Sequence, residues 1–218
     1  MTNPLPNNSH GRAARRLRLA LPLLLILCFP FPAPAQADFA DPEAFLKSAL
    51  KGEDRLSFEA RGDLNGDGLE DWAGVLHRRH PDASQTYQLY VLLRSARGGY
   101  RVAEKSKEAP VAASGCCWVE SLDIGRSSVY VQHNAKSGDS MEAATHQFKL
   151  HRGRWRQVGL RIYRTDHASD TSTDTDINLL TGSVTEKTQT GDAKPSTRRS
   201  RRRFPARLLK DFDFLVRD

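Results

Sequence analysis

The chain has 218 residues, of which 39% are hydrophobic, and this length allows one domain of moderate size. The formal net charge is +7, but residues 1–37 hold four arginines and no acid, and residues 187–218 hold ten basic and four acidic side chains. Residues 38–186 therefore carry a net charge of −3, which excludes a basic domain and assigns the basic character to the C-terminal tail.

The first 37 residues have the order of a signal peptide. Residues 12–18 form a basic region, residues 19–31 an apolar run, and residues 33–37 a small-residue cleavage site of the Ala-x-Ala kind. The apolar run is too short for a comfortable membrane span. We therefore expect cleavage after Ala37, a periplasmic or secreted protein and no transmembrane segment in the mature chain. An uncleaved anchor is the alternative.

The pattern after the signal peptide predicts one short helix followed by many strands. Asp41 is a favourable N-cap, Pro42 fits the first turn, and Gly52 ends the helix. Apolar and polar residues then alternate between regular turn signals, which indicates antiparallel strands. We predict a mostly β fold, an antiparallel meander that forms a half-barrel or small sandwich. The expected strands cover residues 56–60, 72–77, 86–94, 100–103, 118–124, 129–133, 146–150 and 155–163, with one more at 177–184 that is broken at Gly182.

The remaining segments are predicted to be loops and a tail. Residues 166–176 are rich in Ser, Thr and Asp and indicate an exposed loop, without the glycines and spacing of a metal site. The composition of residues 191–200 indicates a linker, and apolar side chains within 205–215 could dock as a short helix or extended segment. We thus expect a β domain at 38–190 and a basic linker with a C-terminal tail at 191–218.

The most specific chemical signal is the stretch from Gly62 to Trp72. It places oxygen-bearing groups at alternate positions, and no Lys or Arg lies between Gly62 and Leu76. Crowded carboxylates favour a bound cation, and hard oxygen ligands suit Ca²⁺. The alternative is a turn rich in Asp, Asn and Gly between two strands. The predicted ligands of one Ca²⁺ ion are the side chains of Asp63, Asn65, Asp67 and Asp71 and the carbonyl of Leu69.

The pattern Asp-x-Asn-x-Asp-Gly-x-x-Asp before a strand resembles the calcium loop of FG-GAP and VCBS-type repeats. It differs from an EF-hand, because the twelfth residue from Asp63 is Gly74 and not Glu. The motif does not recur, and a propeller needs at least four blades, so we expect a single loop. The chain also has the order acidic loop, strand pair, Ser-Gly-Cys-Cys at 114–117, strand pair ending in Trp155, and Asn-Leu-Leu-Thr-Gly at 178–182. Over about residues 45–190 this order resembles an uncharacterised group of exported bacterial proteins with one such loop. That resemblance implies no known activity.

Cys116 and Cys117 are the only cysteines left after cleavage. An oxidising compartment favours a disulfide, and neighbouring cysteines can close only a strained, reducible ring. A mixed or intermolecular disulfide and two buried thiols are the alternatives. Among the histidines, His146 shares the apolar phase of Phe148 and is expected in the core. Trp72, Trp118 and Trp155 are also expected in the core.

Five arginines at the end of the predicted linker and just after it form a candidate anion-binding cluster: Arg198, Arg199, Arg201, Arg202 and Arg203. An exported protein rarely meets nucleic acid, so an anionic envelope component or an acidic protein fits better, with a solvated basic linker as the alternative. We predict a monomeric, non-catalytic binding or envelope-associated module. The competing prediction is a periplasmic enzyme, either a hydrolase or a thiol-redox protein using Cys116 and Cys117.

Overall fold

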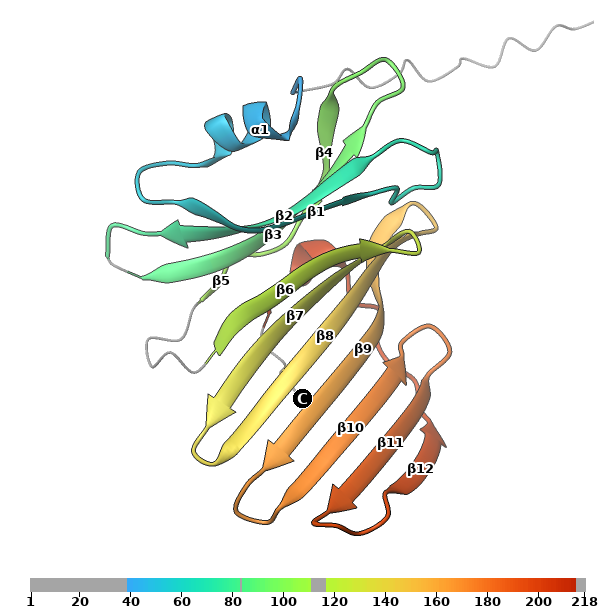
Figure 1. The fold of residues 1–218 in the computed structure, drawn as a ribbon. Helices are drawn as coiled ribbons and strands as arrows, with labels where there is room; N and C mark the ends of the chain where they lie inside the picture. The colour runs from blue at the N-terminus through green and yellow to red at the C-terminus, as the bar shows by residue number, and fades with distance from the viewer. Residues whose placement is uncertain (1–38, 83, 111–116, 215–218) are drawn as a thin grey trace, which may run out of the picture. The chain divides into compact units, whose positions relative to one another are not determined.

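A computed structural model describes residues 39–82, 84–110 and 117–214. The predicted signal peptide lies outside these residues. One α-helix, twelve strands and a 3₁₀ turn make up the described chain (Figure 1). Their bounds are α1 Pro42–Ala49, β1 Arg55–Gly62, β2 Asp71–Arg79, β3 Gln85–Arg94, β4 Tyr100–Lys105, β5 Ala109–Pro110, β6 Cys117–Gly125, β7 Ser128–Ser137, β8 Ser140–His151, β9 Arg154–Asp166, β10 Thr171–Asn178, β11 Ser183–Thr190, β12 Ser196–Arg201 and η1 Leu209–Asp211.

The strands form two antiparallel sheets. The first has the order β1-β2-β3-β4, with β5 paired to β3, and the second follows the chain as a meander from β6 to β12. This arrangement confirms the predicted mostly β sandwich with a short N-terminal helix. Each strand of the second sheet pairs with its neighbour in the sequence, so tight turns suffice to connect it.

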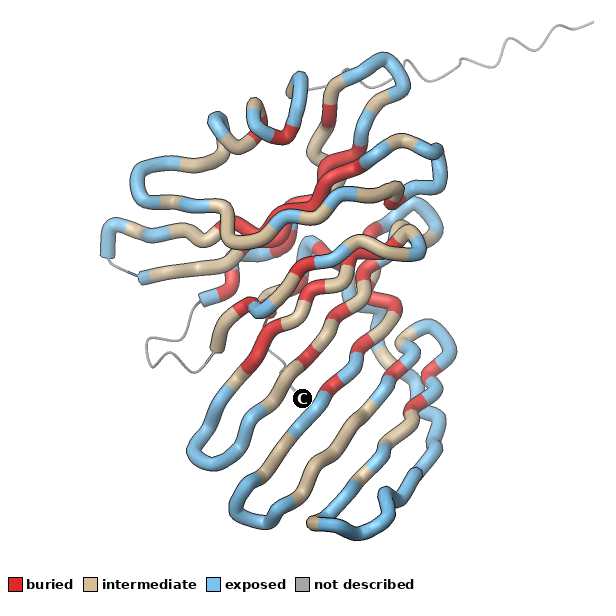
Figure 2. Tube along the Cα trace, in the orientation of Figure 1, coloured by how far each residue is buried: buried red, intermediate tan, exposed pale blue. Residues whose placement is uncertain are grey.

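Helix α1 covers one face of the five-stranded sheet. The carboxylate of Asp41 accepts a hydrogen bond from the backbone N–H of Ala44 at 2.7 Å, which confirms the predicted N-cap. Phe45 of the helix is buried, and its ring contacts those of Trp72 and Tyr90 at centroid distances of 5.7 and 5.1 Å. Because β2 and β3 are covered on both faces, they appear as continuous buried runs (Figure 2).

The other face of the five-stranded sheet shares a core with the seven-stranded sheet. Val75 and Val91 contribute from the first sheet, and Val131 and Phe148 from the second. The chain's described C-terminal segment also enters this core, because Leu209, Phe212 and Phe214 are buried in it. That burial confirms the expected docking of an apolar C-terminal segment.

Predictions in the polar part of the chain were right about one break and wrong about two segments. The strand expected at 177–184 is interrupted at Gly182 as predicted, but its two parts are the end of β10 and the start of β11, which the turn at 179–182 joins. Much of the expected loop 166–176 belongs to β10, and the expected linker contains β12. The common cause is that these strands carry polar side chains on both faces, so no apolar alternation reveals them, whereas β-branched threonines favour the extended backbone.

Two of the three tryptophans are core residues. Trp72 and Trp155 are buried, and Trp118 is half-buried with its indole N–H donating to the carboxylate of Glu120 at 2.7 Å. In the segments that the structure describes, no helix has the length and apolar character needed to cross a bilayer.

Candidate functional site

The acidic loop connects β1 to β2, and Asp71 anchors it. The side chain of Asp71 is fully buried; its Oδ2 accepts from the N–H of Leu64 and its Oδ1 from the N–H of Arg94, both at 2.8 Å. Burial raises the pKa of Asp71, and the two N–H groups oppose that rise. Asp71 therefore ties the start of the loop to the end of β3. The sequence prediction gave it only the role of a ligand.

The exposed part of the loop is shaped by side chains that accept hydrogen bonds from their own backbone. Oδ1 of Asp63 accepts from Gly66 at 2.7 Å and from Asn65 at 3.2 Å, and its Oδ2 accepts from Gly68 at 3.0 Å. The side-chain oxygens of Asn65 and Asp67 each accept from the N–H two residues later at 2.9 Å. These are Asx turns, and they fold the loop without help from a distant segment.

The loop glycines are required by the backbone. Gly66 and Gly68 have φ of 83° and 79°, in the left-handed region that glycine adopts at little cost. Their N–H groups are also the main reason that the pKa of Asp63 is lowered, with Gly68 the larger contributor. Asp63 thus remains ionised in the folded loop at neutral pH.

The carboxylate and amide oxygens of the loop are chemically suited to a hard cation, although they already accept hydrogen bonds from backbone N–H groups of the loop. Carboxylate and amide oxygens have acceptor capacity beyond one hydrogen bond each. In the described chain no group of three or more His, Cys, Asp or Glu side chains converges in a metal-ligating arrangement. A cation would have to draw Asp63, Asn65 and Asp67 together, and the exposure of residues 65–68 leaves room for that adjustment.

A positive charge that the sequence analysis missed lies beside the loop. The guanidinium of Arg61 is 3.7 Å from the carboxylate of Glu70 and 3.4 Å from that of Glu43. Arg61 lies just before Gly62, outside the stretch in which we found no basic residue. Glu70 is therefore paired on the surface, and its side chain is partly neutralised without a metal.

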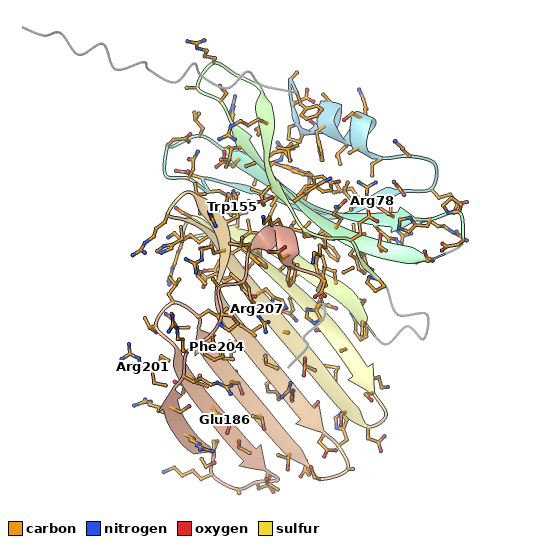
Figure 3. The ribbon with its side chains drawn as sticks, turned by 180° about the vertical axis from the view of Figure 1, so that it is seen from behind. Arg78, Trp155, Glu186, Arg201, Phe204 and Arg207 are labelled. Carbon is orange, nitrogen blue, oxygen red and sulfur yellow. The ribbon has the colours of Figure 1, made fainter. Side chains whose placement is uncertain are left out.

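The five clustered arginines do not lie together. Arg198 and Arg199 are in β12, across from Glu186 and Thr185 of β11. Nε of Arg201 donates to the carbonyl of Thr181 at 2.9 Å. The last two, Arg202 and Arg203, follow the strand, where Figure 3 shows Arg201 and Phe204 close to the end of the sheet. All five are exposed, and Arg201, Arg202 and Arg203 line one surface depression that Arg198 and Arg199 do not line.

Two of the histidines, His133 and His146, form a buried network with Gln157. Nε2 of Gln157 donates to Nδ1 of His146 at 2.9 Å, so the neutral ring of His146 carries its proton on Nε2 and donates it to Nδ1 of His133 at 3.2 Å. Burial lowers the pKa of both rings. His146 is 2% exposed, which confirms its place in the core. The sequence gave no sign of its partners His133 and Gln157, which lie on the two neighbouring strands β7 and β9.

The residues of the enzymatic alternative are spread apart. His77 contacts Gln85, and His80 contacts Thr86 and Glu108; among the described residues no serine hydroxyl is hydrogen-bonded to a histidine. Cys117 begins β6 and is half-buried, whereas Cys116 lies outside the described residues, so the predicted disulfide stays a prediction.

Comparisons with protein-family profiles, with curated proteins and with solved structures give no match for this chain.

Proposed function

We propose that the protein is an exported β module that takes one calcium ion in the loop between β1 and β2 and binds an anionic partner in the cell envelope. Asp63, Asn65 and Asp67 would hold the ion through side-chain oxygens, with the carbonyl of Leu69. Calcium would supply the positive charge that three neighbouring carboxylates otherwise lack. Asp71 would support the site from below, through Leu64 and Arg94.

The single observation that carries this proposal is the folded state of the exposed loop. Its Asx turns already fold the backbone that carries Asp63, Asn65 and Asp67, three oxygen-bearing side chains within five residues, and the lowered pKa of Asp63 keeps its carboxylate anionic. Because this backbone is already folded, binding an ion would require only the side chains to turn toward it, and it would cost less chain entropy than ordering the whole loop. We therefore expect bound calcium to make the loop more rigid and to leave the structure of the flanking sheets unchanged.

Thermal unfolding with calcium and with a chelator tests this proposal. At ten times the dissociation constant, binding to the folded state alone adds about 1.4 kcal/mol to the free energy of unfolding. Asp67→Ala should abolish the calcium-dependent rise in Tm. Glu70→Ala is the matched control, since Glu70 pairs with Arg61, and it should retain the rise.

Isothermal titration provides the second readout. Extracellular calcium modules bind at roughly 10⁻⁴ to 10⁻³ M, so heat should be measurable at millimolar calcium. Identical melting curves in calcium and chelator, together with no heat of binding, would show that the loop is a turn that binds no calcium.

A further inference from the structure

We propose that the end of the seven-stranded sheet holds the phosphate head group of an anionic lipid, in a depression between two hairpin tips. The inference rests on the proposed function, because it names the anionic partner and its site. The depression has a volume of about 600 Å³, in the size range of small-molecule sites. Its walls are the β8–β9 turn, the β10–β11 turn and the chain that leaves β12.

The first argument is charge. Six cationic or potentially cationic side chains line the depression, and no acidic side chain does: His151, Arg152, Arg156, Arg201, Arg202 and Arg203. None of the five arginines forms an ion pair within the described residues. Like charges held close together without counter-charges favour a bound anion, and the planar guanidinium fork matches phosphate oxygens in two-point hydrogen bonds.

The second argument is that the backbone of the site is fixed. The N–H of Arg202 donates to the carbonyl of Gly182 at 2.9 Å, and a Cβ at Gly182 would lie 2.1 Å from the carbonyl oxygen of Arg202. Gly182 also has φ of 77°. Only glycine allows the exit of β12 to approach the β10–β11 turn this closely. The N–H of Leu179 donates to the carbonyl of Val158 at 3.0 Å, which fixes the same turn to β9.

The third argument is the apolar part of the lining, which distinguishes a lipid from free phosphate. Leu179, Leu180 and Phe204 line the depression beside the arginines. Leu180 is 49% exposed at the hairpin tip, and the guanidinium of Arg202 stacks on the ring of Phe204 at 5.0 Å from its centroid. Exposed leucine next to arginine is the combination by which surface segments bind the boundary between head groups and acyl chains.

Titration of the expected mature chain, which begins at residue 38, with soluble short-chain lipids tests the inference. The probes are dihexanoyl phosphatidic acid, dihexanoyl phosphatidylcholine and glycerol phosphate, all in EDTA, so that the calcium loop plays no part. We expect phosphatidic acid to bind more tightly than glycerol phosphate, and phosphatidylcholine to bind least.

The decisive variants remove the same charge from two places. Arg156→Gln with Arg203→Gln should weaken binding of phosphatidic acid by roughly 25-fold, since each basic residue near an anionic head group contributes about 1 kcal/mol. Arg198→Gln with Arg199→Gln removes two arginines of β12 that do not line the depression, and should weaken it by less than about threefold. Leu180→Asn should weaken binding of the lipid by roughly tenfold and leave glycerol phosphate unaffected.

Each possible outcome supports or overturns the proposed lipid site. Equal weakening by the two double variants would mean diffuse attraction and would overturn the site. Equal binding of lipid and glycerol phosphate, with no effect of Leu180→Asn, would overturn the lipid assignment. Absence of binding would overturn both. Lipid binding in EDTA by a chain that shows no calcium-dependent Tm would retain this inference and remove the calcium part of the proposed function.

Discussion

The β2–β3 pair and the β10–β12 strands are built from the same antiparallel hydrogen bonds but are stabilised differently. Both faces of β2 and β3 are covered, and Leu76, Leu89 and Leu92 have no exposed surface. In β12 every residue is exposed, and β10 is mostly half-buried (Figure 2). Apolar burial therefore supports the first pair, whereas cross-strand contacts support the second group, as in the two-point ion pair of Arg161 with Asp174 at 2.9 and 2.8 Å.

The largest expected effect follows from this contrast. Leu92→Ala on β3 removes a fully buried side chain and should lower the free energy of unfolding by about 3 kcal/mol. Thr173→Ala on β10 truncates a half-buried side chain and should cost less than about 1 kcal/mol. Chemical denaturation of both variants measures the difference. Similar losses at the two positions would show that burial is not what separates the two regions.

The second-largest expected loss of stability comes from the close packing of Trp72 against Gly74 in β2. The ring of Trp72 lies across Gly74, and a Cβ there would be 2.0 Å from a ring carbon, so Gly74→Ala should cost about 2 kcal/mol through forced displacement of the ring. The matched control is Gly125→Ala in β6, where the nearest atom would be 3.9 Å away. Denaturant midpoints compare the two. A loss confined to Gly125→Ala would contradict the packing of Trp72.

The His133–His146 pair should make stability depend on pH. Burial lowers the pKa of both rings, and most strongly that of His146. The charges of His133 and Arg207 lower the pKa of His146 further. At His133 the charge of Glu142 opposes the shift. Unfolded histidines titrate near 6.5. From pH 7.5 to 5.5 the unfolded chain therefore takes up protons that the folded chain does not. The free energy of unfolding should fall by about 1–2 kcal/mol over this range.

Unfolding measured at several pH values tests that dependence. His146→Gln should flatten the slope even if it lowers stability at every pH. His167→Gln, at an exposed position, should leave the slope unchanged. A slope that is insensitive to His146→Gln would assign the pH dependence to other groups.

The smallest expected change in stability comes from substitutions in and just after the exposed edge strand β12. Replacing Arg198, Arg199 and Arg203 together with serine should change the free energy of unfolding by less than about 1 kcal/mol, because exposed charges contribute little to the folded state. Thermal melts at low and high salt measure this. A large loss would mean that β12 supports the sheet through its side chains as well as its backbone.

The parts of the fold that sequence predicted are those where burial leaves a pattern. The apolar runs in β2 and β3, the capped helix at Asp41 and the docking of the segment around Leu209 are all visible as spaced apolar or capping residues. Most of β10 and β11 and all of β12 were missed, because polar side chains on both faces show no period. The first half of β8, Ser140 to Thr145, was missed because its alanines and polar residues give no apolar alternation.

The two candidate sites also differ in how far their residues could be predicted from the sequence. The acidic loop is local in sequence, so its residues could be named from the motif, although the burial of Asp71 and the nearness of Arg61 could not. The basic depression joins Arg156 of β9 to Arg203, which follows the end of β12. Such convergence depends on sheet register, which is only weakly specified in strands that are polar on both faces.

The docking of residues 209–214 between the sheets has a consequence for how the chain folds. The seven-stranded meander can form by successive hairpins as the chain emerges, because each strand pairs with the one before it. The core between the sheets cannot close until Leu209, Phe212 and Phe214 have arrived. A chain delivered from its N-terminus therefore completes its core last, and partly delivered chains expose apolar surface that holding chaperones recognise.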